Sequence, residues 1–276
     1  MSLLGELNIS RIRKQVIAEF GLSPSGIIDI GEFHYNKNDV LAEIDHPDFI
    51  GRLRWHQQVW ERPAMLQMLE EMYFDQALFY GAALPFYTEE GRAFLSPYFA
   101  FAFEQLSRSL LQTNDLDSLG IVLPYTDLIE AADREAAFRP IRIYLDENIR
   151  VLRNINKDNY PQMSAQLSHW IKQDWSFFIN HLPDEYYDER VDLATYLVNV
   201  TVSIQKTFWQ DCYSISLQLS KLEHLPASLN QTIMNNHSIY ANHGSPRTVV
   251  GSDVNWRLIV FGLLVAVRIL LAMQHC

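Results

Sequence analysis

The chain has 276 residues, of which 48% are hydrophobic and 12% aromatic, so it can bury a substantial core and is not intrinsically disordered. Its formal net charge of −11 argues against nucleic-acid binding, because phosphate contacts need clustered Lys and Arg. Only two cysteines, Cys212 and Cys276, are present, which excludes a disulfide framework, and no signal-peptide pattern opens the sequence, so we expect a cytoplasmic protein.

Two different patterns open the chain. The stretch ELNISRIRKQVIAEF gathers its apolar residues near one helical face and is interpreted as an amphipathic first helix, with a helix that docks on a partner as the alternative. The following stretch, GIIDIGEFHY, is rich in Ile and bounded by Gly and Asn, which is typical of strands. It predicts one small β-hairpin near residues 26–36.

Prolines punctuate the helical patterns that fill most of the remaining chain. Pro97, Pro124 and Pro140 are each interpreted as first-turn residues of a helix. In the first turn a backbone N–H has no acceptor within the helix, so the missing N–H of Pro costs nothing there. The polar stretch TNDLDSLG at 113–120 predicts a loop. In the helix expected from Pro140 onward, four charged residues have the three- and four-residue spacing of ion pairs: Arg142, Asp146, Glu147 and Arg150.

A long helix is predicted over roughly 185–224. Within it, VNVTVSI at 198–204 alternates like a strand, but the apolar residues fit one helical face over a longer window, so we favour a helix. Two stretches, RWHQQVW and HWIKQDW, each hold tryptophans five residues apart. Five residues turn a helix through about 500°, so the two rings of each pair should point to different faces.

The C-terminal part is divided by composition into a helical body at 1–234, a polar linker at 235–253 and a hydrophobic helix at 254–276. Residues 258–273 are apolar or Gly except Arg268. This apolar run is shorter than the ~20 residues of a membrane span. We therefore favour a helix that contacts protein, with a tail anchor through 258–273 as the alternative. Its expected interaction residues are Trp256, Phe261, Leu264 and Arg268.

Acidic residues and histidines are densest at 29–46. Glu32 and His34 would project from the same side of a strand, and Glu43 and His46 have the i, i+3 spacing of helical metal sites. Those sites use two such pairs, whereas this sequence holds one. A metal bound by these four residues, serving a metal-dependent helical enzyme, is therefore an alternative hypothesis.

These patterns predict an all-α fold, an irregular multi-helix bundle or a short helical array. No Gly-rich phosphate loop, nucleophile elbow or His-Glu-x-x-His motif is present, and we expect no cofactor. The favoured function is a non-catalytic protein that works through protein contacts, as an adaptor or a component of an assembly, with a protein partner or by self-association. The metal-dependent enzyme and a tail-anchored membrane-associated protein are the alternatives.

Overall fold

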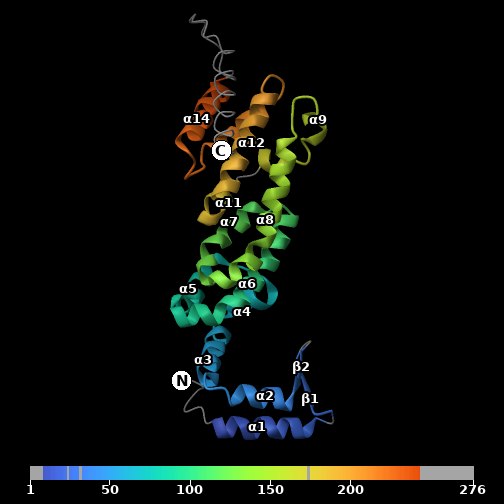
Figure 1. Cartoon of the computed structure of the whole chain (residues 1–276), viewed down its shortest axis with the longest axis vertical. Coiled ribbons are helices and arrows are strands. Elements are labelled where there is room, and N and C mark those ends of the chain that lie inside the picture. Colours follow the sequence, from blue (N-terminus) through green and yellow to red (C-terminus); the bar gives the residue numbers. More distant parts are fainter. Residues whose placement is uncertain (1–8, 24, 31–32, 173–174, 243–276) are drawn as a thin grey trace, which may run out of the picture. The chain divides into compact units, whose positions relative to one another are not determined.

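The computed structural model describes residues 9–23, 25–30, 33–172 and 175–242 (Figure 1). The chain separates into a large unit, Met1–Tyr240, and a short C-terminal unit, Ala241–Cys276, of which only two residues belong to the described part. The fold below is that of the large unit. It is all-α apart from one hairpin, as the sequence predicts.

The first part of the large unit contains α1 (Ile9–Leu22), β1 (Ile27–Ile30), β2 (Phe33–Asn36), α2 (Lys37–Ile44), α3 (Phe49–Trp60), α4 (Pro63–Glu71), α5 (Gln76–Ala83), the 3-10 helix η1 (Leu84–Tyr87) and α6 (Glu89–Gln112). The second part contains α7 (Leu116–Val122), η2 (Leu123–Leu128), α8 (Ala131–Arg153), α9 (Tyr160–Met163), α10 (Ser168–Lys172), α11 (Ser176–Asn180), η3 (Asp184–Tyr186), α12 (Tyr187–Ile204), α13 (Trp209–Leu219) and α14 (Ala227–Asn242).

The N-terminal elements pack separately from the main core. β1 and β2 pair antiparallel, with Ile27 opposite Asn36, which confirms the predicted hairpin. The Asn36 side chain then accepts hydrogen bonds from two backbone N–H groups and caps α2. In α1 and α2 only Phe20 and Ile44 are buried, whereas the continuous hydrophobic core begins at Val59 and ends at Tyr240.

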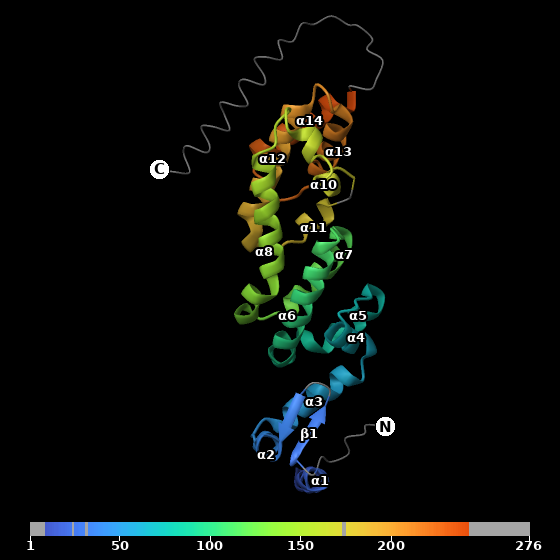
Figure 2. The same ribbon diagram turned by 90° about the vertical axis from the view of Figure 1, so that its right-hand side faces the viewer.

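The most extensive helix packing joins α6 to α8 (Figure 2). Ser96 near the start of α6 donates a hydrogen bond to Asp133 near the start of α8. Further along both helices, the rings of Phe103 and Phe138 lie 5.2 Å apart between centroids. Residue numbers therefore rise together on the two helices, so α6 and α8 run parallel.

The same relation holds between α8 and α12, which lie side by side in Figure 1. The Arg142 guanidinium lies 5.6 Å from the ring centroid of Tyr186, just before α12, and Arg153 lies 5.0 Å from that of Tyr196. In an up-and-down bundle successive long helices run antiparallel. The parallel course of α6, α8 and α12 therefore excludes a simple up-and-down bundle of these three helices.

Three local predictions from proline and loop signals are wrong. Pro97 and Pro140 lie inside α6 and α8, not in their first turns, because the helices begin earlier, at Glu89 and Ala131. A Pro inside a helix costs about 3 kcal/mol, which the extensive burial along both helices offsets. The expected loop at 113–120 contains the start of α7, where the Asp115 side chain caps the helix by accepting from Ser118 N at 3.1 Å.

The long helix expected at 185–224 is broken into α12 and α13. The residues VNVTVSI are helical, because Val200, Thr201 and Ile204 turn inward with a helical period and are buried. This confirms the helix and excludes the strand.

The second tryptophan pair is brought together by a break between helices. Trp170 lies in α10 and Trp175 directly precedes α11, and both are fully buried. Their rings meet edge to face at 5.2 Å, and Trp175 Nε1 donates to the carbonyl of Trp170 at 2.9 Å. The first pair differs, since Trp60 remains 72% exposed.

The boundary expected between helical body and linker lies too early. α14 continues through Asn242, so residues 235–242 of the expected linker belong to a helix. Ile233 and Tyr240 are buried, and His237 Nδ1 lies 3.0 Å from the Ser216 hydroxyl. Leu229, Ile233 and Tyr240 have helical spacing, which the polar composition between them obscures. The remaining linker residues, 243–253, and the hydrophobic segment 254–276 lie outside the described residues.

Candidate interaction surfaces

The residues predicted to bind metal are not gathered in the described part of the chain. Glu32 lies outside the described residues, and His34 is exposed on β2. Glu43 Oε1 pairs with Arg52 Nη2 at 2.9 Å, and His46 Nδ1 accepts a backbone hydrogen bond at 3.2 Å. Within the described ranges, no three His, Cys, Asp or Glu side chains come together as a metal site would need.

The predicted interaction residues Trp256, Phe261, Leu264 and Arg268 also lie outside the described residues, as does the whole of 258–273. Among the helices that the structure describes, none has the length and the apolar character that a bilayer span needs.

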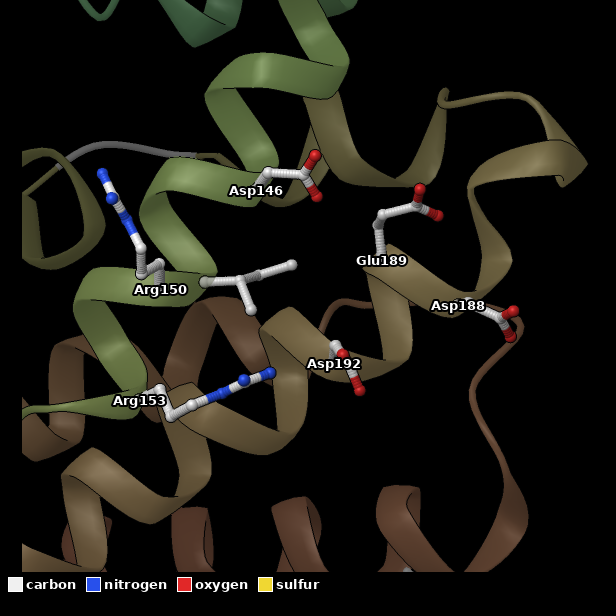
Figure 3. A pocket seen from close by; sticks show the side chains of 7 residues that line it. Asp146, Arg150, Arg153, Asp188, Glu189 and Asp192 are labelled. Atoms are coloured by element: carbon white, nitrogen blue, oxygen red, sulfur yellow. The ribbon is translucent and has the colours of Figure 1, made fainter. Parts of the chain in front are cut away.

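A charged groove lies between the parallel helices α8 and α12, with a cavity of about 440 Å³ (Figure 3). One face of α8 supplies four of its lining residues, at positions that recur every three or four residues, and the first turns of α12 supply the other three. The lining residues are Asp146, Ile149, Arg150, Arg153, Asp188, Glu189 and Asp192.

The charged side chains of this groove are not joined in ion pairs. Across the described residues, none of its six charged side chains makes an ion pair with N···O within 4.0 Å. The pair expected between Asp146 and Arg150 is therefore not formed. Figure 3 shows the reason, since Asp146 points toward Glu189 on α12 while Arg150 points away from that helix. Arg153 instead lies over the Tyr196 ring.

The environment of the groove shifts the pKa of Asp192. Burial raises the pKa of this carboxyl, the neighbouring Asp188 carboxylate adds to the rise, and the Arg153 guanidinium opposes it. The groove lining contains carboxylates, guanidinium groups and one Ile, but no Ser, Cys or His. It is therefore suited to ionic recognition of a ligand.

A second surface, here called the Tyr80 face, consists of Tyr80, Leu84 and Tyr87, which are 61%, 53% and 39% exposed. Tyr80 and Leu84 are four residues apart and so lie about 40° apart on a helix. The 3-10 geometry of η1 then aligns Leu84 and Tyr87, three residues apart, directly above one another. A different side of these elements carries Phe79 and Phe86, which are fully buried.

Polar groups border the Tyr80 face. Burial raises the pKa of Tyr87, and Tyr125, Asp127 and Tyr80 raise it further, which places these groups within electrostatic range of one another. Tyr125 itself is buried and packs edge to face against Phe79, with centroids 5.1 Å apart. The face thus presents exposed rings and hydroxyl groups on a rigid aromatic base.

Neither surface follows from the sequence patterns. FYGAALPFY contains two apolar stripes of the same spacing, one through Phe79, Ala83 and Phe86 and one through Tyr80, Leu84 and Tyr87. A helix that is apolar all round does not reveal which stripe faces solvent. The groove requires the parallel packing of α8 and α12, which no local pattern indicates.

Comparison with known proteins identifies no relative of this chain: no protein-family model, curated protein or solved structure matches it.

Proposed function

We propose that this protein is a non-catalytic helical adaptor or assembly component, which binds a protein partner through the Tyr80 face. The observation that carries the proposal is the exposure of Tyr80, Leu84 and Tyr87 on one side of α5 and η1. Contiguous exposed apolar residues are uncommon on monomeric soluble proteins and mark interaction sites. Tyr is also among the residues favoured at the centre of protein interfaces.

Two further features support the proposal. Eight of the eighteen exposed large apolar side chains in the described residues lie between Trp60 and Phe101, the part of the sequence that contains the Tyr80 face. In addition, helical arrays present extended surfaces to partners, and the charged groove on α8 and α12 supplies a second surface, whose charged side chains form no ion pair with the described residues. Ionic groups of this kind contribute more to partner choice than to affinity.

The proposal is tested by affinity capture from the lysate of the source cells, followed by quantitative mass spectrometry. The full-length chain is compared with a Tyr80→Ser/Leu84→Ser variant and with Ile143→Ser, a matched control because Ile143 on α8 is 51% exposed. We expect proteins that are enriched at least ~10-fold on the wild type and on Ile143→Ser to be lost from the double variant. Identical captures on all three baits would contradict the proposal.

A further inference from the structure

The outward face of α3 has the character of a self-complementary surface. The helix is anchored by Val59, which is buried in the core, and by Trp55, whose ring lies 5.7 Å from that of Phe86. On the other side of the helix Trp60 is 72% exposed, and only Leu22 exceeds it among the exposed large apolar residues of the described ranges. Leu53 lies seven residues before Trp60, on nearly the same line along the helix.

Two opposite charges lie beside this apolar line. Arg54, in the middle of α3, and Glu61, its C-cap residue, are exposed and seven residues apart, so they lie on one side of the C-terminal half of α3. Arg54 makes no ion pair with any residue of the described part of the chain. Between them, Gln57 Nε2 donates to Glu61 Oε1 at 2.5 Å.

We propose that α3 pairs antiparallel with α3 of a second copy of this chain. A two-fold axis near Gln57 places Arg54 of each copy opposite Glu61 of the other and brings each Trp60 over the Leu53–Arg54 turn of its partner. This arrangement meets the requirement of a two-fold interface: if one residue contacts a second residue of the other copy, the second residue also contacts the first residue of the other copy. A parallel pairing is disfavoured because it would set Arg54 against Arg54 and Glu61 against Glu61.

The choice of a second copy as occupant rests on this charge complementarity. Because Arg54 and Glu61 lie on either side of Gln57, the charges of α3 complement those of a second, antiparallel α3. A different protein would not need this arrangement to bind here. One helix face is smaller than a standard interface, so the dimer is weak and concentration-dependent, with a dissociation constant in the roughly micromolar range. The pairing uses α3 and is independent of the Tyr80 face.

The test is sedimentation equilibrium of the full-length chain from about 1 to 300 μM, a range that brackets micromolar dissociation constants. We expect Trp60→Ser, Arg54→Glu and Glu61→Arg each to weaken dimerisation by at least ~10-fold. The double variant Arg54→Glu/Glu61→Arg restores the opposite charges and should regain the wild-type dissociation constant. Ile143→Ser and Lys157→Glu, at exposed positions on other elements, are the matched controls and should dimerise as the wild type does.

The double variant gives the sharpest outcome because a merely destabilised chain would not recover. A monomeric wild type, or a dimer that survives Trp60→Ser, overturns the proposal, as does a double variant weaker than either single one. Circular dichroism of every variant confirms folding. Loss of partners from Tyr80→Ser/Leu84→Ser together with a monomeric wild type would leave the proposed function standing while the pairing fails.

Discussion

His169 should make the protein sensitive to mild acid. This side chain is 8% exposed, and its Nε2 lies 3.1 Å from Asn148 Oδ1, which also accepts from Trp170 Nε1 at 2.8 Å. Asn148 is fixed in turn by the bond from its Nδ2 to the carbonyl of Tyr144. Burial lowers the pKa of His169 from 6.5 to about 4, although a backbone hydrogen bond at Gln166 opposes this.

The sign of the effect follows from proton binding in the two states. Between pH 6.5 and 4 the unfolded chain carries a proton on His169 that the folded chain does not. The stability contributed by neutral His169 is therefore fully present above pH 6.5, and the free energy of unfolding decreases as the pH falls from 6.5 toward 4. The two pKa values of 6.5 and about 4 correspond to a loss of about 3 kcal/mol, a large part of a typical domain stability.

The assay is urea unfolding at pH 7, 5.5 and 4, followed by far-ultraviolet circular dichroism. His169→Gln keeps an N–H donor for Asn148 and removes the titrating group, so its free energy of unfolding should fall about 3 kcal/mol less than that of the wild type between pH 7 and 4. His224→Asn is the control, because His224 is exposed and has a positive φ of 57°, which Asn tolerates. Parallel curves for the wild type and His169→Gln would refute the reasoning.

Three further predictions concern single side chains. A Cβ on Gly91 would lie 2.9 Å from backbone atoms of Phe86 and Pro85, so Gly91→Ala should lower the free energy of urea unfolding by about 1–3 kcal/mol, whereas Gly81→Ala, with open space around it, should raise it by about 0.5–1 kcal/mol. Tyr160→Phe removes a 2.7 Å hydrogen bond to Asp211 and should lower the free energy of unfolding by about 1.5 kcal/mol in the same assay; an unchanged value would contradict a stabilising role for this bond. Burial raises the pKa of Cys212 to about 12, so in a Cys276→Ser background we expect a thiol reagent to label it only at the rate of unfolding, and fast labelling of folded protein would disprove this.

The fold class and the hairpin could be predicted because both depend on local patterns. Ile27 and Ile28 stand in a short β-branched run bounded by turn residues, and the structure pairs that run as expected. The helical face through Val200 and Ile204 also outweighed a local strand-like alternation, since a helix of that length buries more apolar surface than an isolated strand.

Helix boundaries could not be predicted from proline alone. Pro97 and Pro140 resemble helix starts, but each follows a cap or first turn that carries weaker signals, such as Thr88, whose hydroxyl accepts from Gly91 N. A single Pro costs about 3 kcal/mol, which a helix with a long buried face can offset. The outcome is therefore set by tertiary packing, which the residues near the proline do not encode.

The exposure of the Tyr80 face could not be predicted from the sequence. Tyr80, Leu84 and Tyr87 have the spacing of a core stripe, and they are exposed only because Phe79 and Phe86 already occupy the inward side. Which of the two apolar stripes is exposed depends on which one packs against the core, and only the three-dimensional structure shows this.

The Tyr80 face and the charged groove lie on different helices. Most exposed aromatic residues of the described ranges lie between Trp60 and Phe101 in the sequence, while the charged groove is formed by α8 and α12. Desolvated aromatic contacts supply most of the affinity of an interface, and charged groups steer encounter and select the partner. A partner that spans both regions would bind through the first and be selected by the second. Charge changes at Asp146 or Asp192 should then alter the association rate and its salt dependence, whereas loss of Tyr80 or Leu84 should raise the dissociation rate.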